Sequence, residues 1–248
     1  MKNNSRFEPM EKYQKSTLEK TDTTTPWYHG HRARMHAKLA EKGADNLTES
    51  ELLELLLMQA LPRRDVKPIV HDLLAQFGHL GNVLGASVDE LVQIHGIKEN
   101  TAYFLKLIHA VAKQSALSQI QDRPLLSNWE RLFDYANTIF AGENVEKLYI
   151  LFLDNQLRLI KSQMHQTGSV NHIPVYPRDI LKSALNWNAS AVILMHNHPS
   201  GDPHPSKDDI AATSEIQKAL QDVDIRLIEH LIVGKGHKAH SMKADGIL

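Results

Sequence analysis

The sequence predicts an α/β protein in two parts, an all-helical N-terminal domain and a C-terminal α-β sandwich. Residues 27–120 carry a helical apolar pattern, and no stretch among them alternates as a strand would. Short continuous apolar runs then appear at 148–153 and 191–195, separated by helical segments, as in the buried strands of an α/β sheet. The composition changes at Gln121-Asp122-Arg123-Pro124, so we expect domains over 27–123 and 124–248.

The composition excludes several classes of protein. The chain has 248 residues, 42% of them apolar, which is enough to bury a core. It contains no cysteine, which removes disulfide scaffolds, thiolate zinc fingers, iron-sulfur clusters and cysteine nucleophiles. Any metal must therefore be bound by His, Asp or Glu. The 28 Lys+Arg against 29 Asp+Glu argue against a surface built throughout to neutralise phosphates.

The N-terminal residues 1–26 are rich in Lys, Glu, Ser and Thr and have no usable hydrophobic period. Such a segment buries too little apolar area to offset its ordering entropy, so we expect a disordered tail. It lacks the apolar core of a signal peptide, and no apolar run in the chain approaches the roughly 18 residues of a membrane helix. We expect a cytoplasmic protein without a membrane partner.

Two helix starts are well marked in the helical domain. Thr48 with Glu51, and Ser87 with Glu90, each form the Ser/Thr-x-x-Glu pattern of a capping box ahead of an apolar run. Glycines at 78, 81 and 85 supply turn residues between helices. This domain is therefore expected to be a small helical bundle.

The second domain alternates helices and strands in the order α-β-β-α-β-α-β. Its first helix is the amphipathic stretch 129–140, and Pro177 at a first helical position begins the second. Ser206 begins the third helix. The expected elements in order are a helix at 129–140, strands at 148–153 and 157–167, a helix at 177–187, a strand at 191–195, a helix at 206–220 and a strand at 225–233.

Three potential metal ligands follow the strand at 191–195. His196 and His198 project to one face of an extended segment, so both imidazoles can reach one ion. Three prolines and a glycine then form a tight loop before Ser206, which places Asp209 in the first turn of the next helix. Two imidazoles and a carboxylate with one open position are typical of catalytic zinc. A 2-His-1-carboxylate iron site is the rival, and Ser206 with Asp209 also fits a plain helix start.

The spacing His196-x-His198-x7-Ser206-x2-Asp209 resembles the JAMM motif of MPN-domain metallohydrolases, and the longer run HNHPSGDPHPSKDDI resembles the RadC family. The runs at 151–154, 168–171, 175–180 and 230–234 extend the resemblance, which covers about residues 32–248. It implies a JAMM/MPN (cytidine-deaminase-like) fold with Zn²⁺ on His196, His198 and Asp209. It also implies that Ser206 stabilises the transition state and that a glutamate comes from an earlier strand.

Glu146 is the candidate for that glutamate and hence for the general base. JAMM enzymes carry it at the entrance of the first strand, and Glu146 stands directly before the apolar residues of the run at 147–151. The alternative is an exposed charge at a strand edge, and Glu143 or Glu229 could serve as the base instead.

The segment 91–105 resembles a helix-hairpin-helix, which presents backbone N–H groups to a DNA phosphate, and RadC relatives carry such a domain here. Lys98 replaces the second glycine of that pattern, after Gly96. Residues 27–123 carry 11 Lys+Arg against 11 Asp+Glu, so their net charge is zero. A hairpin kept for packing and a weak DNA contact both remain open.

Three functions follow from these observations. The leading one is a zinc-dependent hydrolase acting on the amide bond of a peptide, isopeptide or protein substrate. The second is a factor associated with DNA repair or recombination, whose metal centre is structural or acts on nucleic acid. The third is a scaffold, which the presence of all three ligands disfavours. The motif gives a reaction class, and neither the substrate nor the oligomeric state can be read from it.

Overall fold

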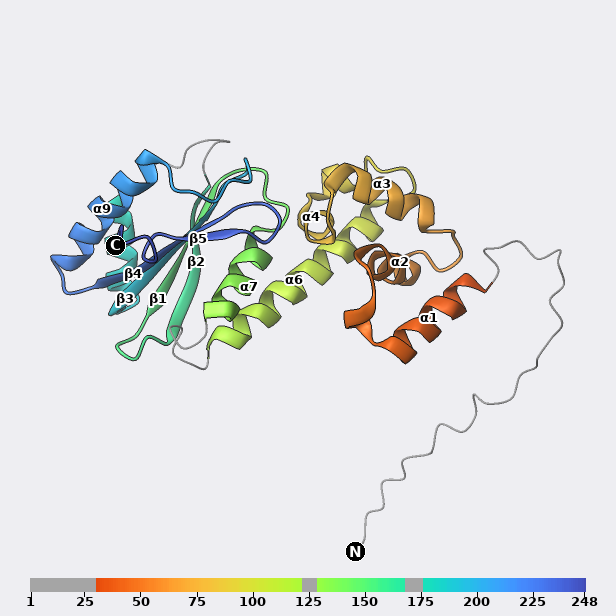
Figure 1. Ribbon diagram of the computed structural model, residues 1–248, viewed down its shortest axis with the longest axis horizontal. Coiled ribbons are helices and arrows are strands. Elements are labelled where there is room, and N and C mark those ends of the chain that lie inside the picture. The colour runs from red at the N-terminus through yellow and green to blue at the C-terminus, as the bar shows by residue number, and fades with distance from the viewer. Residues whose placement is uncertain (1–29, 122–128, 168–175) are drawn as a thin grey trace, which may run out of the picture.

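A computed structural model describes residues 30–121, 129–167 and 176–248 (Figure 1). The predicted tail at 1–26 and the run at 168–171 lie outside these residues. Figure 1 shows a helical lobe and a sheet lobe, with one long helix running from the first into the second. No helix in the described part of the chain is both long enough and apolar enough to cross a membrane.

The first lobe is all helical, as predicted. Its elements are α1 (His31–Lys42), η2 (Ala44–Asn46), α2 (Glu49–Ala60), α3 (Lys67–Phe77), α4 (Leu80–Gly85), α5 (Val88–Leu91) and α6 (Glu99–Gln121). Both predicted capping boxes form: the Thr48 hydroxyl accepts from the Glu51 N–H, and Ser87 accepts likewise from Glu90. Leucines such as Leu53 are fully buried in this lobe's core.

The second lobe follows the predicted order and adds one strand. Its elements are α7 (Trp129–Phe140), β1 (Lys147–Leu153), β2 (Leu159–Thr167), α8 (Pro177–Asn186), β3 (Ala191–Asn197), α9 (Lys207–Gln221), β4 (Arg226–Val233) and β5 (Ala239–Ser241). Strand β5 was not predicted, because three residues are too few to show an alternating pattern. Strand β2 begins two residues later than predicted, since Leu157 has a φ of 61° and belongs to the turn after β1.

The sheet has the order β2-β1-β3-β4-β5, in which only the pair β3-β4 is parallel. Alternate side chains of its central strands enter two separate cores. Leu151 and Ile193 face α7 and the end of α6, whereas Ile150 and Leu194 face α8 and α9. This layering puts the carboxyl end of β3 beside the start of α9, where the predicted ligands lie.

The two lobes meet at a close backbone contact. A Cβ atom on Gly85, the last residue of α4, would lie 1.9 Å from the Ala141 carbonyl oxygen and 2.6 Å from Gly142 Cα in the loop before β1. Helix α6 joins both cores, because Leu105 is buried in the helical lobe and Ile120 in the sheet lobe. The contact and the shared helix hold the start of β1 against the helical lobe.

Candidate metal centre

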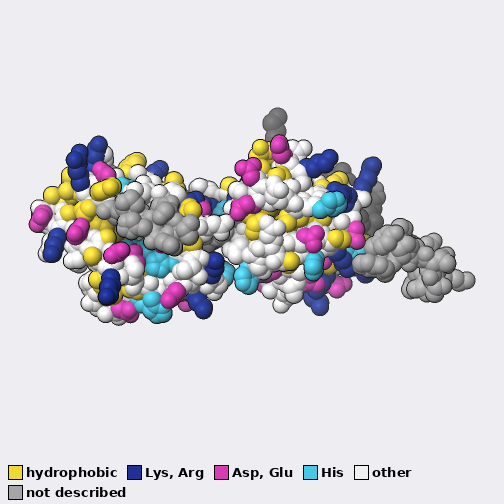
Figure 2. Space-filling model, turned by 90° about the horizontal axis from the view of Figure 1, so that it is seen from above, with side chains coloured by type: hydrophobic (Ala, Val, Ile, Leu, Met, Phe, Trp, Pro, Cys, Tyr) yellow, Lys and Arg dark blue, Asp and Glu magenta, His cyan; other side chains and the backbone are white. Residues whose placement is uncertain are grey.

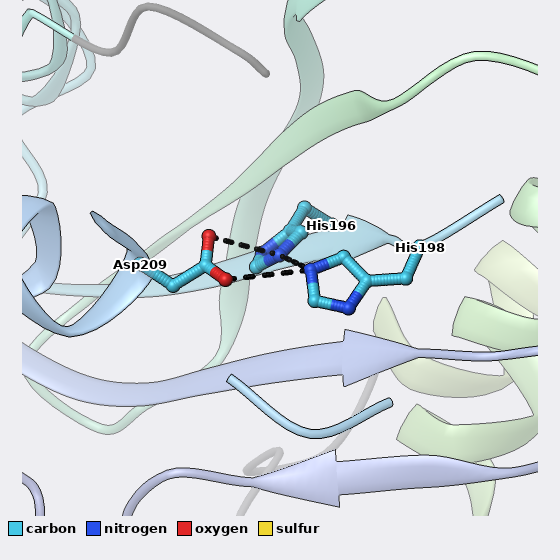
Figure 3. A group of neighbouring side chains, drawn as sticks. All are labelled: His196, His198 and Asp209. Atoms are coloured by element: carbon cyan, nitrogen blue, oxygen red, sulfur yellow. Dashed lines mark hydrogen bonds and ion pairs between the residues drawn. The ribbon is translucent and has the colours of Figure 1, made fainter. Parts of the chain in front are cut away.

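The structure brings His196, His198 and Asp209 together at the end of β3 (Figure 3). His196 is in β3, and His198 follows it with its N–H donated to the Val233 carbonyl of β4 at 2.8 Å. Asp209 lies in the first turn of α9. His196 Nε2 lies 2.9 Å from His198 Nε2 and 3.3 Å from Asp209 Oδ1, and His198 Nε2 lies 3.4 Å from Asp209 Oδ2.

These separations fit one small cation. Ligand atoms held about 2.0 to 2.1 Å from a tetrahedral ion are separated from one another by about 3.3 Å. Within residues 30–121, 129–167 and 176–248, no other group of three or more His, Asp or Glu side chains meets the same geometric requirement. Since His198 and Asp209 are only partly buried, one side of the site remains accessible.

Burial and mutual contact set the protonation of the three side chains. Burial lowers the pKa of His196 to about 4 against the opposing charge of Asp209, so its imidazole is neutral near pH 7. Burial works against the Asp209 carboxylate, but its hydrogen bonds with His198 and Ser206 and the nearby His196 hold its pKa well below the usual range. Burial lowers the pKa of His198, yet its hydrogen bonds with Asp209 and with the Asp202 carbonyl, together with the charges of Asp209 and Glu146, outweigh burial and raise the net pKa. A metal would compete with a proton for His198.

A buried chain of hydrogen bonds behind the site fixes the His196 tautomer. His196 Nδ1 lies 2.7 Å from His230 Nε2, and His230 Nδ1 lies 2.7 Å from Thr213 Oγ1. The Thr213 hydroxyl donates to the Asp209 carbonyl at 2.5 Å. We assign the protons in one direction, with His196 Nδ1–H donating to His230 and His230 Nδ1–H donating to Thr213. This assignment leaves the Nε2 lone pair of His196 directed at the metal position.

His230 and Thr213 were not predicted as site residues. His230 lies in a run that supported the RadC resemblance, but nothing local marks it as a partner of His196, which is 34 positions away. Its imidazole is buried, and burial together with the neighbouring His196 lowers its pKa well below the ordinary value. His230 is therefore neutral and able to both donate and accept, as the chain requires.

Ser206 is the N-cap of α9, as predicted. Its hydroxyl accepts from the Asp209 N–H at 3.1 Å and its backbone N–H donates to Asp209 Oδ2 at 2.8 Å, which forms a complete capping box. The hydroxyl also donates to Asp209 Oδ2 at 2.6 Å. The helix-start and metal-ligand interpretations of Asp209 are thus compatible. The cap fixes the carboxylate, while Asp209 Oδ1 faces His196.

Glu146 lies directly before β1, the strand that pairs with β3. The antiparallel register pairs Leu148 with His196, which puts Glu146 level with His198. The Glu146 charge contributes to the raised pKa of His198. Asn197 holds the segment on both sides of Glu146: its Oδ1 accepts from the Lys147 N–H at 2.8 Å and its Nδ2 donates to the Val145 carbonyl at 3.0 Å. Asn197, which lies between the two histidines in the sequence, therefore positions the candidate base Glu146.

The alternative carboxylates have other partners. Glu143 forms an ion pair with Lys147. Glu229 is 1% exposed and accepts hydrogen bonds from the His230 N–H at 2.8 Å, the Ser241 hydroxyl at 2.6 Å and the Lys243 N–H at 3.2 Å. These bonds give Glu229 a role in holding β5 and the segment after it against β4.

The predicted hairpin at 91–105 lies between α5 and α6. Gly96 has a φ of 96°, whereas Lys98 is not among the residues with positive φ. The Lys98 carbonyl instead accepts the first helical bonds of α6, and the Gly96 carbonyl accepts from Arg64 Nη1 at 3.2 Å. On the face shown in Figure 2, basic and acidic side chains are interspersed over both lobes. These contacts give the hairpin a packing role within the helical lobe.

Comparison with known proteins extends over most of the chain. Residues 126–247 match the model of the RadC-like JAB domain, and residues 27–103 match that of the UPF0758 N-terminal domain. A UPF0758 protein of Rhodobacter capsulatus is 45% identical over 206 residues, which is 83% of this chain and 96% of the relative. The chain belongs to the RadC family. The helical lobe is thus the UPF0758 N-terminal domain, and the sheet lobe has the α/β fold of a JAB/MPN domain.

The hydrogen-bond chain leads to a prediction for this RadC protein. Replacing His230 by Phe removes the partner of His196 Nδ1 while keeping a ring in the buried space. Loss of such an outer partner typically weakens metal binding by about 10- to 100-fold. We expect that loss in competition with a metal-binding dye, with the fold retained by circular dichroism. Thr213→Val, one bond further away, should have a smaller effect in the same direction; unchanged affinity in both variants would contradict the assigned role.

Proposed function

We propose that this RadC protein is a zinc-dependent hydrolase of amide or isopeptide bonds in a peptide or protein substrate. The observation that supports it most directly is the convergence of His196, His198 and Asp209, with ligand atoms 2.9 to 3.4 Å apart at an accessible site. Three protein ligands leave a fourth position for water, as in catalytic zinc sites. An iron site would use the same donors, and membership of the JAB class favours zinc hydrolysis over iron oxygenation.

The positions of the surrounding residues support the following roles in this reaction. Zinc, when bound, supplies a water whose pKa falls to about 7. Glu146, level with His198, accepts a proton at its carboxylate and passes it to the leaving amine. Ser206, whose hydroxyl donates to Asp209 Oδ2 at 2.6 Å, would turn this proton to the oxygen on which negative charge develops. His230 and Asn197 position His196 and Glu146 respectively.

Elemental analysis tests the metal site. The purified chain should contain about one zinc per molecule, and the His196→Ala/His198→Ala variant should contain none, since two of its three nitrogen and oxygen ligands are gone. The His204→Ala variant is a matched control, because His204 lies in the loop between His198 and Ser206 and is exposed. Among the described residues its contacts are a hydrogen-bonded ion pair with Asp202 and a ring contact with His240. Unchanged zinc in the double variant would make the assignment wrong.

A substrate screen tests the reaction. Peptide and isopeptide libraries would be incubated with the zinc-loaded chain and with the double histidine variant, and cleavage would be followed by mass spectrometry. We expect products that only the zinc-loaded chain forms. Cleavage of a phosphodiester substrate alone, with the same dependence on His196 and His198, would replace the amide hydrolase by a nuclease.

The DNA-associated function leads to a separate prediction. The hairpin carbonyl of Gly96 is held by Arg64, and the region 27–123 has no net charge, so we expect weak, salt-sensitive binding of duplex DNA. Fluorescence anisotropy of the full chain with a labelled duplex measures it. Tight binding at physiological salt that is lost on changing Gly96 or Lys98 would contradict this expectation and favour the repair function.

A further inference from the structure

A cavity of about 430 Å³ lies between the two lobes, on the side of the sheet opposite the metal site. It is lined by α6, by α7 and by the start of β1, and Figure 1 shows α6 and α7 running alongside one another there. Tyr149 of β1 lines the cavity and lies on the face of the sheet that packs against α7. Leu148, which pairs with His196, lies on the opposite face and packs against α8 and α9. The cavity is therefore separate from the proposed catalytic centre.

Its α6 wall carries two lysines and a histidine. Lys106, His109 and Lys113 recur at helical spacing and all line the cavity. The Lys106 ammonium donates to the Leu84, Gly85 and Ala86 carbonyls, at 3.2, 2.7 and 2.8 Å, so its three protons are used at the end of α4. Lys106 therefore contributes a positive charge at the cavity but has no N–H group left to donate to a ligand.

Lys113 differs from Lys106 because, among the described residues, its ammonium has no hydrogen-bond or ion-pair partner. Glu143 lines the same cavity, but its carboxylate is paired with Lys147. Burial lowers the pKa of Lys113, and the nearby Glu143 charge offsets only part of this decrease. Burial and the charges of Lys113 and Lys106 lower the pKa of His109 to about 4. Glu90 also lies near Lys106 and offsets part of the positive charge. A partly buried cation with no partner is the feature an anionic ligand would satisfy.

The rest of the lining is apolar and aromatic. Leu117 and Ile139 form part of it, and Tyr135 and Tyr149 contribute rings. The Tyr135 hydroxyl is bonded to Ser162 at 2.7 Å, whereas the Tyr149 hydroxyl has no hydrogen-bond partner in the described part of the chain. The volume lies within the range of small-molecule sites, which combine such apolar walls with a few polar groups.

We propose that this cavity binds a small organic anion, with its anionic group against Lys113 and its ring against Tyr149. The charged group is a phosphate or a carboxylate, since either would accept from the free ammonium. The site belongs to neither matched domain alone: the family models cover 27–103 and 126–247, and Lys106, His109 and Lys113 lie between them. A ligand there contacts both lobes at once. The proposal is independent of the hydrolase activity.

Calorimetric titration of the full chain with phenyl phosphate and with benzoate tests the site. We expect saturable binding of at least one of them at concentrations up to about 10 mM, with benzyl alcohol and inorganic phosphate binding more weakly. The stronger of the two aromatic anions identifies the charged group. Absence of binding by both, or equal binding of benzyl alcohol, would overturn the proposal.

Variants locate the binding. Lys113→Ala should weaken it by about tenfold or more, and Lys113→Arg should restore part of it. Lys218→Ala, at an exposed position of α9, is the matched control and should bind as the natural chain does. His196→Ala should also bind normally, because the metal site lies on the other face of the sheet. Arg63→Ala changes a separate cavity beside α3 and should leave the affinity unchanged. If Lys113→Ala kept the affinity, or if Arg63→Ala lost it, the anion would bind elsewhere and the proposal would be overturned.

Discussion

Glu146→Gln should retain the fold and about one zinc per chain while hydrolysis falls by about 10²- to 10⁴-fold, the usual contribution of general acid-base catalysis. Glutamine keeps the size of the side chain but cannot accept a proton near neutral pH. The backbone on both sides of position 146 is held by Asn197, so the substitution should leave the segment in place. Single-turnover rates on a substrate found by the screen, with zinc analysis of the same sample, measure both quantities.

Asp209→Asn is the matched comparison, because it also neutralises one carboxylate of the site. It should weaken zinc binding itself, since Asp209 lies 3.3 Å from His196 Nε2 and is one of the three proposed ligands. Full activity of Glu146→Gln would move the base to Glu143 first and then to Glu229, although both have other partners. Loss of zinc from Glu146→Gln would make Glu146 a ligand or a structural support and remove the mechanism as proposed.

Gly85→Ala should destabilise the chain by about 1 to 3 kcal/mol or more, the usual cost of overpacking. Its Cβ would lie 1.9 Å from the Ala141 carbonyl oxygen and 2.5 Å from the Ala141 carbonyl carbon. Both are backbone atoms, so relief requires the loop before β1 to move away from α4. Urea unfolding followed by circular dichroism measures the change in the free energy of unfolding.

Gly81→Ala provides a matched control in the same helix. A Cβ there meets Ala141 Cβ at 3.6 Å, an ordinary contact, so the substitution should be neutral or stabilise by up to about 1 kcal/mol. Equal stability of the Gly85 and Gly81 variants would show that the close contact between the lobes does not contribute to folding.

The sequence by itself determined the features that depend on residues close together along the chain. The capping boxes at Thr48, Ser87 and Ser206 form within four positions, so their patterns are complete in the sequence. The strand at 191–197 was predicted from the continuous apolar run at 191–195, which is typical of a buried strand.

The His-x-His-x7-Ser-x2-Asp motif also indicated the family and the candidate ligands. Because imidazoles at i and i+2 share one face of a strand, His196 and His198 could be paired from their spacing. Asp209 followed from the helix start. These inferences needed no knowledge of how distant elements pack.

Tertiary structure alone decided what surrounds the site. His230 reaches His196 because β4 lies parallel to β3, and Asn197 reaches the backbone beside Glu146 because β1 lies antiparallel to β3. Strand β5 and the contact between Gly85 and Gly142 likewise depend on pairing and packing across many residues. The physical reason is that a hydrogen bond or a close contact between segments leaves no period in either of them. Local patterns therefore revealed the ligands and caps, and only the folded chain revealed the residues that position them.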